Sequence, residues 1–381
     1  MREVTLKVLD SLATAPAMEW DALTNGNPTL SHAFLQSMID AGCTTMATGW
    51  LPQFLTLTRE IDGRESLTGA VPLYLKTHSY GEYVFDWAWA EAYQRHNLDY
   101  YPKLLAAVPF TPCTGARVMA LTSADRSRLV EGMLTLAAQN DVSSLHVLFP
   151  EEHEQRLLVA AGMMPRSSVQ FHWRNAGYRN FDEFLATMSH DKRKKIKQER
   201  RRVRDAGITF RHVDGTAIRE DDWDFFFSCY RRTYRAHLST PYLNREFFGL
   251  IGERMPANIL LIVAERGGQP IASAMNIFSA TTLFGRYWGA HEFHSGLHFE
   301  ACYYQALEFC IERGIAVFEG GAQGEHKLAR GFLPVKCRSA HWLKHPQFAK
   351  AVEDFLLREA GGVDHYVDEL NESAPYKIGK L

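Results

Sequence analysis

"VLFPEEHEQRLLVAAGMMPRSSVQFHW", residues 147–173, and "AVFEGGAQGEHKLARGFLPVKCRSAHW", residues 316–342, have the same length and align without a gap. Both place a glycine three residues before a proline, and both end in histidine and tryptophan. This shared spacing indicates that the chain contains two diverged copies of one unit. The aligned pairs are Phe149 with Phe318, Ala160 with Ala329, Gly162 with Gly331, Pro165 with Pro334, His172 with His341, and Trp173 with Trp342.

A weaker repeat precedes each of these stretches. "FLTLTREIDGRESLTGAVPLYL" (54–75) and "ILLIVAERGGQPIASAMNIF" (259–278) each predict two strands joined by a tight turn that contains glycine. Trp89 and Trp288 then follow in segments that we predict as short aromatic strands. Each half continues with an amphipathic helix, a strand, a second helix and a final strand. The predicted long helices cover 123–140 and 299–313, and the strands that follow them cover 145–149 and 315–319.

Length and composition agree with a duplicated globular protein. At 381 residues, the chain exceeds the roughly 250–300 residues at which single cores stop growing. We therefore predict an α/β (α+β) protein of two domains, 1–170 and 171–381. A net charge of −2 excludes a globally basic nucleic-acid binder but allows a local basic patch. Six scattered cysteines, no signal-peptide pattern and no apolar run of membrane-spanning length predict a cytoplasmic protein with reduced thiols.

The second copy differs from the first in the stretch "GGAQGEHKLARGF", residues 320–332. Its first eight residues align with "EEHEQRLL" (151–158), which reads as an ordinary helix start. Glycines remove side chains and let the backbone approach a ligand, so this loop is a candidate site. The alternative is a tight strand–helix turn with solvated charges. The loop lacks the Walker and dinucleotide-binding patterns, and the chain has no G-x-S-x-G elbow of a serine hydrolase. The segment "HEFHSGLH" (291–298) lacks the histidine spacing of a zincin, so we expect no metal site there.

A basic run, residues 192–204, contains nine lysines and arginines and a single acid, Glu199. We predict a helix over 190–205 that Ser189 caps, with Ile196 and Val203 as a thin apolar seam. Such a helix repels itself unless it meets acidic neighbours or an anionic ligand. Three explanations of this unbalanced positive charge remain open. The helix contacts a polyanion, it is a solvated surface, or it packs against acidic residues of the same chain. The candidate polyanion-binding residues are Lys192, Arg193, Lys194, Lys195, Lys197, Arg200 and Arg201.

Several segments together resemble one family. They are "AYQRHNLDYYPKLLAAVPFTPCTGAR" (92–117), "FHWRN" (171–175), "KRKKIKQERRRV" (192–203) and residues 297–334. The chain resembles, over nearly its whole length, the Fem-like group of tandem GNAT-fold proteins of peptidoglycan biosynthesis or recognition. The resemblance implies two GNAT-like domains. It also implies transfer of an amino acid from aminoacyl-tRNA to an amine of a peptidoglycan precursor.

The resemblance leaves the donor open. Ordinary GNAT enzymes use acyl-CoA and hold its pyrophosphate with a Q/R-x-x-G-x-G/A loop before the central helix. At that place this chain reads "HEFHSGLHFE" (291–300), without the pattern. We therefore expect an aminoacyl or acyl transferase that needs no cofactor, with tRNA or a nucleotide-linked cell-wall precursor as partner. The alternatives are an acyl-CoA-dependent N-acyltransferase and a non-catalytic module that binds a precursor or RNA.

Acyl transfer to an amine needs a proton acceptor and donors for the oxyanion. Glu300, at the start of the central helix, and His326 are the candidate base or proton relay. The candidate substrate-binding residues lie in the glycine-rich loop and in a segment of the first half that the second half lacks. They are Gly320, Gly321, Gln323, Gly324, Lys327 and Arg330 in the loop, and Arg95, Lys103, Thr111 and Arg117 in the segment, which we expect to contact the acceptor.

Overall fold

The computed structural model describes residues 4–322 and 324–377, and the chain divides into two units. Unit 1 comprises residues 1–168 and 336–365, and unit 2 comprises 169–335 and 366–381. The first crossing lies two residues from the predicted boundary at 170. The division differs from the prediction in that residues 336–365, near the end of the chain, belong to unit 1. Gln323, one of the predicted site residues, lies outside the described residues.

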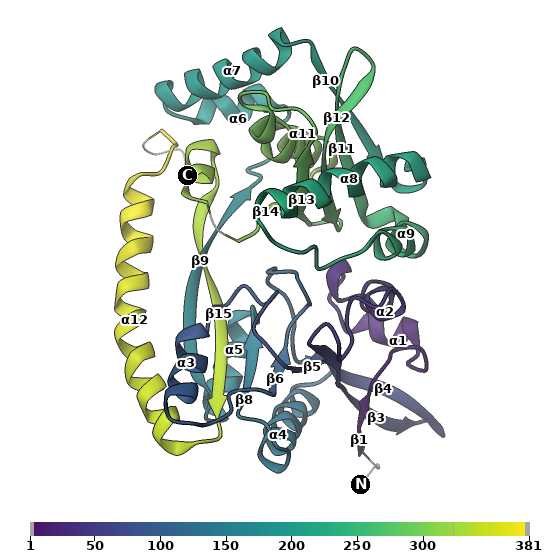
Figure 1. Ribbon diagram of the computed structural model, residues 1–381, viewed down its shortest axis with the longest axis vertical. Helices are drawn as coiled ribbons and strands as arrows, with labels where there is room; N and C mark the ends of the chain where they lie inside the picture. The colour runs from purple at the N-terminus through teal and green to yellow at the C-terminus, as the bar shows by residue number, and fades with distance from the viewer. Residues whose placement is uncertain (1–3, 323, 378–381) are drawn as a thin grey trace. The chain divides into compact units, whose positions relative to one another are not determined.

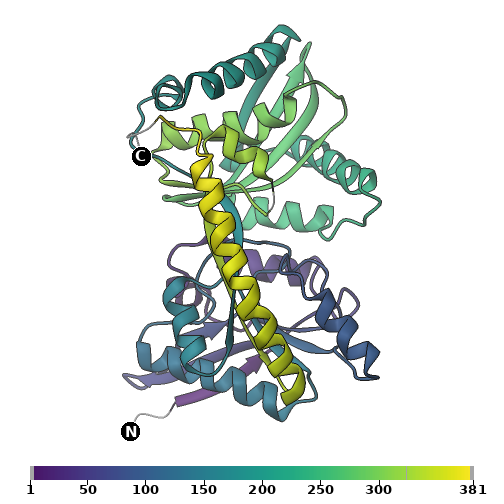
Figure 2. The ribbon, with the colours of Figure 1, turned by 90° about the vertical axis from the view of Figure 1, so that its left-hand side faces the viewer.

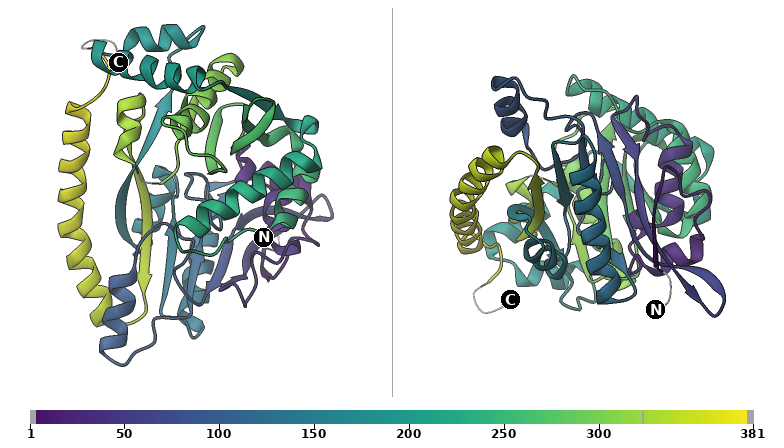
Figure 3. Two further views of the ribbon diagram at one scale, coloured as in Figure 1. Left: turned by 45° about the horizontal axis from the view of Figure 1, so that its top comes forward. Right: turned by 90° about the horizontal axis from the view of Figure 1, so that it is seen from below.

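Unit 1 contains strands of two sheets (Figure 1). The order in the first sheet is β1 (Val4–Leu9), β3 (Phe54–Ile61), β4 (Arg64–Val71), β7 (Met119–Ala120). The order in the second is β15 (Leu333–Leu343), β8 (Ser144–Leu148), β6 (Lys103–Ala106), β5 (Leu73–Lys76), β2 (Trp50–Pro52). The helices are α1 (Ala17–Ala22), α2 (His32–Asp40), α3 (Trp87–Arg95), α4 (Ser123–Gln139), α5 (Glu152–Ala160) and the first part of α12 (Pro346–Glu372). Figure 3 shows α4 and the α1–α2 pair on opposite sides of the first sheet.

The strands of unit 2 follow the order β10 (Ile208–Asp214), β11 (Ile259–Arg266), β12 (Gln269–Phe278), β13 (Thr282–Ala290), β14 (Val317–Glu319), β9 (Met164–Arg174). All neighbours in this order are antiparallel except β13 and β14, which are parallel. Helices α8 (Glu220–Ala236) and α9 (Arg245–Arg254) accompany one face of the sheet. The other face carries α6 (Phe181–Thr187), α7 (His190–Asp205), α10 (Leu297–Phe299), the π-helical turn η4 (Glu300–Tyr304) and α11 (Gln305–Arg313) (Figure 2).

Local sequence signals explain most of these elements. The turn between β3 and β4 uses Asp62 and Gly63 at positive φ, and Gly267 and Gly268 do the same between β11 and β12. Asn180 caps α6 by accepting a hydrogen bond from the Glu183 backbone N–H at 3.0 Å. Ser189 stands at the N-cap of α7, although its side chain makes no capping hydrogen bond.

The duplicated stretches have corresponding elements. Strand β8, helix α5 and strand β9 in the first copy match β14, the 3-10 helix η5 (Glu325–Arg330) and β15 in the second. The two final strands are exchanged between the units, because residues 169–174 of β9 lie in unit 2 and residues 336–343 of β15 lie in unit 1. Accordingly, Trp173 pairs with Phe318 of β14, and Trp342 pairs with Leu145 of β8.

One predicted strand is a helix. Trp89 lies in α3, whereas Trp288 lies in strand β13 as predicted. Trp89 is buried against the ring of His341, with ring centroids 5.0 Å apart. Trp89 is therefore buried by a helix and not by a strand. In a short aromatic segment, the sequence pattern alone does not distinguish these two structures.

Close packing of β13 against α8 depends on a missing side chain. A Cβ built on Gly289 would lie 2.0 Å from the Cys229 carbonyl oxygen of α8. We expect Gly289→Ala to lower the free energy of unfolding by about 1–3 kcal/mol or more, because backbone must move to admit the methyl group. Chemical denaturation measures the loss. The matched control is Gly361→Ala in α12, where a Cβ meets no atom within 4 Å; a loss as large in this variant contradicts the packing argument.

Candidate functional site

The parallel pair in unit 2 opens into a cleft. Strands β13 and β14 are paired from Thr282 with Val317 to Phe284 with Glu319. The next residues on the two strands are Gly285 and Gly320, and both line a cavity of about 100 Å³. Neither carries a side chain, so the backbone forms this part of the cavity wall. We call it the β13–β14 cleft.

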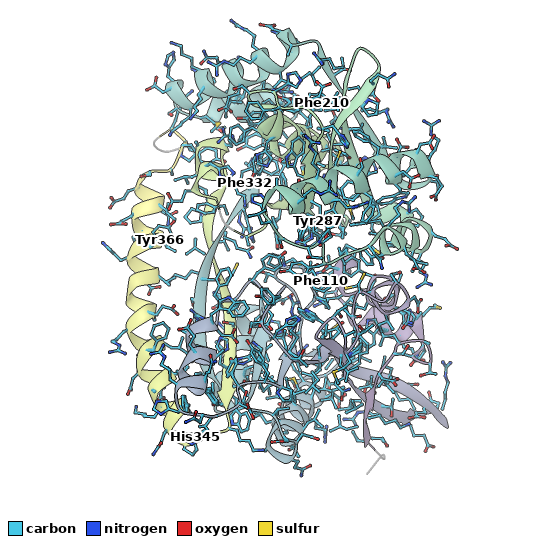
Figure 4. The ribbon with its side chains drawn as sticks, viewed as in Figure 1. Phe110, Phe210, Tyr287, Phe332, His345 and Tyr366 are labelled. Carbon is cyan, nitrogen blue, oxygen red and sulfur yellow. The ribbon has the colours of Figure 1, made fainter. Side chains whose placement is uncertain are left out.

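A β-bulge shapes one wall of the cleft. Met275 of β12 is opposite Tyr287 of β13, and Asn276 is opposite Gly285, so Arg286 is an extra residue on β13. Bulges redirect side chains and interrupt the hydrogen-bond ladder, and they occur frequently beside active sites. Here Asn276, Arg286 and Tyr287 all line the cleft. Tyr287 is labelled in Figure 4.

Asn276 is the most informative residue of this wall. Its side chain is 2% exposed, and its Nδ2 atom is buried without a hydrogen-bond partner among the described residues. A buried donor that is left unsatisfied costs about 1–3 kcal/mol. Such a cost in a cavity-lining amide points to a ligand that accepts the hydrogen bond.

The opposite wall comes from the helix between β13 and β14. His298, Cys302 and Tyr303 line the cleft from α10 and the turn η4. A π-helical turn inserts a residue into the helix and is frequent at functional sites. Burial lowers the pKa of His298 to about 4 and raises the pKa of Tyr303. At neutral pH, therefore, the imidazole is uncharged and the phenol keeps its proton.

His326 meets this wall through Tyr303. Its Nε2 atom lies 3.0 Å from the Tyr303 hydroxyl. Burial, with the nearby charges of Lys327 and Arg330, lowers the pKa of His326 below its ordinary value. The neutral ring can accept the phenolic proton in a hydrogen bond, so His326 acts on the cleft through Tyr303.

The structure does not bring Glu300 together with His326. Glu300 is ion-paired with Arg200 of α7 at 2.9 Å and lines a different cavity, beside α7. Burial raises the pKa of its carboxyl group, while the Arg200 charge opposes this shift. Of the two candidate proton acceptors, His326 is linked to the cleft through the Tyr303 hydroxyl, whereas Glu300 lines the cavity beside α7.

The charges of the glycine-rich loop point inward. Lys327 is buried and donates to the Gly321 carbonyl oxygen at 3.0 Å; burial lowers its pKa to about 8. Arg330 is buried, pairs with Glu199 of α7 at 2.8 Å and lies 3.3 Å from the centroid of the Phe299 ring. These contacts hold the loop in place, and the assignment of Lys327 and Arg330 as substrate contacts stays a prediction. Among the predicted glycines, Gly320 lines the cleft, while Gly321 and Gly324 provide turns at positive φ.

Helix α7 forms as predicted, with Ile196 and Val203 buried along its seam. Arg200 is an exception among the predicted polyanion-binding residues, because it pairs with Glu300 and, at 2.8 Å, with Glu308. Lys197 lies 3.7 Å from the exposed Asp182. The remaining candidates make no ion pair with another described residue; they are Lys192, Arg193, Lys194, Lys195 and Arg201.

In unit 1, most of the predicted acceptor contacts are interior residues. Lys103 is 0% exposed and pairs with Glu82 and Asp86. Thr111 is buried and donates to the Pro109 carbonyl oxygen. Arg95 alone is exposed, where it pairs with Glu91. These positions do not gather into a surface for a ligand.

Arg117 lies beside the corresponding parallel pair of the first copy. Strands β6 and β8 form the corresponding parallel pair. Beyond it, Arg117 Nε donates to the Leu148 carbonyl oxygen at 2.8 Å, and the Gly115 backbone N–H donates to the Phe149 carbonyl oxygen at 3.2 Å. In the first copy, therefore, Gly115 and Arg117 bond to the backbone directly after β8, next to its parallel pair with β6.

Sequence reasoning missed most of the residues that line the β13–β14 cleft. They are Ala274, Met275, Asn276, Gly285, Arg286, Tyr287, Trp288, His298, Cys302 and Tyr303. The one available signal was Gly285, since a glycine inside a strand often marks a bulge or a close approach of backbone. No three His, Cys, Asp or Glu side chains in residues 4–322 and 324–377 gather as metal ligands. Within the same residues, no helix has the length and apolar character to cross a bilayer.

The comparisons with known proteins agree on the family and the fold. The FemAB-like family model, described as peptidoglycan biosynthesis/recognition, matches residues 11–378. The crystal structure of FemX is similar at 12% identity and TM-score 0.55, over 89% of this chain and 98% of that chain. L-PGS from Bacillus licheniformis is similar at 10% identity and TM-score 0.54, over 89% and 96%. None of the curated proteins matches this chain in sequence.

A protein of unknown function from Bacteroides thetaiotaomicron VPI-5482 is similar as well, at 11% identity and TM-score 0.52, over 88% of this chain and 99% of that chain. At these identities the likeness concerns the fold alone. The predicted architecture of two tandem GNAT-like domains is confirmed. Family and fold together support an acyl or aminoacyl transferase of peptidoglycan biosynthesis.

The ion pair between Arg330 and Glu199 provides a test of the structural role of the loop. We expect Arg330→Met to lower the free energy of unfolding by about 3–5 kcal/mol, because it leaves a buried carboxylate without its partner. Adding Glu199→Gln should recover part of that loss by removing the unpaired charge. Thermal and denaturant unfolding of both variants measure this. An Arg330→Met variant as stable as the parent protein would return Arg330 to the substrate-binding residues.

Proposed function

Because the chain belongs to the FemAB-like family, we propose that unit 2 transfers an aminoacyl group to an amine of a peptidoglycan precursor in the β13–β14 cleft. The observation that carries this proposal is the Asn276 Nδ2 donor, which has no partner among the described residues, in a cavity that two glycines help to line. A transferase needs hydrogen-bond donors at the carbonyl oxygen that becomes negative in the transition state. Asn276 offers one such donor without any rearrangement of its neighbours.

The reaction steps follow from the side chains on the two walls of the β13–β14 cleft, Asn276 on one and Tyr303 on the other. The acceptor amine attacks the ester carbonyl carbon of the donor, and the oxyanion that forms accepts a hydrogen bond from Asn276 Nδ2. The amine's proton passes to the Tyr303 oxygen while Tyr303 gives its own proton to His326. Collapse of the intermediate breaks the ester bond and releases the donor alcohol, which takes back the proton, leaving the new amide. Tyr303 and His326 are suited to this relay by their 3.0 Å hydrogen bond.

The contact of α7 with Gly296, at the start of α10, favours aminoacyl-tRNA over acyl-CoA as the donor. In GNAT enzymes that use CoA, the pyrophosphate meets the loop and backbone amides at the start of the central helix. Here Gly296 begins that helix, and the Glu199 carbonyl oxygen and the Val203 Cγ2 atom of α7 lie 3.5 Å from where its Cβ would be. A carbonyl oxygen and an apolar side chain at this place disfavour a pyrophosphate. The cationic face of α7 supports an RNA-linked donor instead.

Asn276→Ala tests the site. We expect kcat to fall by roughly 100- to 1,000-fold, as for other lost oxyanion donors, without a fall in the melting temperature, because Nδ2 has no hydrogen-bond partner to lose among the described residues. The assay follows a radiolabelled amino acid from aminoacyl-tRNA to a nucleotide-linked muropeptide. Ser273→Ala is the matched control, since its hydroxyl is also buried and unpaired on β12 but lies outside the cleft.

Three outcomes of this assay would overturn parts of the proposal. Full turnover by Asn276→Ala would place the chemistry elsewhere. Turnover with acetyl-CoA and none with aminoacyl-tRNA would identify an acyl-CoA enzyme. Binding of both substrates without any turnover would identify a binding module.

The relay predicts a pH dependence. His326 can accept the Tyr303 proton only when it is neutral, and its pKa is lowered below 6.5. We therefore expect kcat/KM to fall as the pH decreases through a value below 6.5, and to be insensitive to this group above it. His326→Gln should reduce kcat and abolish this acidic limb, which a pH–rate profile measures. An unchanged limb in His326→Gln would remove His326 from the relay.

A further inference from the structure

The first sheet of unit 1 ends in a strand that is bonded on one edge alone. In the strand order β1–β3–β4–β7, β1 pairs with β3, and no second strand flanks it in the described part of the chain (Figure 1). β1 has six residues and pairs with β3 without a bulge, whereas β7, at the other end of the sheet, has two residues. The long, regular edge of β1 presents backbone N–H and C=O groups that another strand can bond.

This edge lacks the usual protection against strand pairing. Exposed edges in soluble proteins commonly carry free charges, a proline or a bulge. β1 contains no proline, and its single charged residue, Lys7, is paired with Glu65 of β4 at 2.7 Å. Leu6 and Val8 are each 41% exposed. The composition of β1 therefore favours a second strand over water at its edge.

A groove beside β1 gives room for the side chains of a second strand. It has a volume of about 510 Å³ and is lined by Val4, Leu6 and Val8 of β1, by Leu55 of β3 and by residues of α4. The helix comes close to the strand at Gly132, where a Cβ would lie 3.0 Å from the Leu6 Cδ1 atom. An added strand sends every second side chain to the same face of the sheet. The groove therefore fits a strand with apolar residues at alternate positions.

We propose that this strand is β1 of a second copy of the chain, paired antiparallel about a twofold axis at Leu6. In that register Leu6 faces Leu6 of the second copy, Val4 faces Val8, and Thr5 faces Lys7. The groove residues of β1 thus meet apolar residues, and no like charges are opposed. A register shifted by one residue would put Lys7 opposite Leu6, and a further shift would oppose two lysines. The chain is therefore complementary to itself in one register, and the twofold contact closes as a dimer.

Sedimentation velocity of the full chain over roughly 1–100 µM tests the association and needs no transfer activity. We expect a monomer–dimer equilibrium. Leu6→Lys opposes two lysines at the axis and should raise the dimer Kd at least tenfold. Leu98→Lys is the matched control, since Leu98 is 39% exposed and lies outside the groove; it should change the Kd less than threefold. Melting temperatures of both variants check that they fold.

Two results of this measurement overturn the proposal. One is a parent chain that stays monomeric at every concentration, including the case in which β1 binds an extended peptide of another protein instead. The other is a dimer that Leu6→Lys and Leu98→Lys weaken equally.

Cysteine cross-linking tests the register independently. Leu6→Cys places two thiols opposite each other, so oxidised glutathione should join two chains in a disulfide that dithiothreitol cleaves. Val8→Cys is the control, because its two thiols are four residues apart along the paired strands, about 13 Å, which is too far for a disulfide. The parent chain, with its six cysteines, gives the background. A dimer in which Leu6→Cys does not cross-link, or in which Val8→Cys cross-links as readily, overturns the proposed pairing.

Discussion

The place of α7 depends on an ion pair that water hardly reaches. Glu199 of α7 accepts from Arg330 of the glycine-rich loop and from the Tyr304 hydroxyl of η4. One carboxylate therefore ties together the helix, the loop and the turn that carries Tyr303. Opposite charges in a poorly hydrated setting hold such a geometry firmly, since separating them leaves a charge without solvent. The same contact lies next to the place where Glu199 and Val203 of α7 approach Gly296, at the start of α10.

Features encoded locally could be predicted from the sequence. The Asp62-Gly63 and Gly267-Gly268 turns, the Asn180 cap and the apolar seam of α7 each depend on residues a few positions apart. The duplication could be predicted as well, because its spacing survives divergence. The exchange of final strands could not, since both copies have the same local pattern whichever sheet they join. Long-range pairs decide it, such as His146 with His341, whose Nδ1 atoms lie 2.7 Å apart.

The candidate site was harder to predict than the fold, for a physical reason. Charged residues stand out in a sequence, and sequence analysis selected Lys103, Arg117, Lys327 and Arg330, all of which are buried in hydrogen-bond networks. The cleft is lined largely by uncharged residues brought together by a bulge and by two strands that stop pairing. Asn276 is conspicuous only because its amide has no partner, which a sequence does not reveal.

The exchange of the final strands determines the order in which the two units can be completed during synthesis. Strand β8 pairs with β15, so a ribosome that has just completed residue 168 has produced a first unit whose sheet still lacks its last strand. The bulk of unit 2, residues 169–335, emerges before residues 336–343 arrive to close that edge. An unpaired strand edge attracts other chains. Unit 1 can therefore complete its sheet only after most of unit 2 has been synthesised. A truncation that removes one copy of the duplicated unit would also remove a strand from the sheet of the other unit.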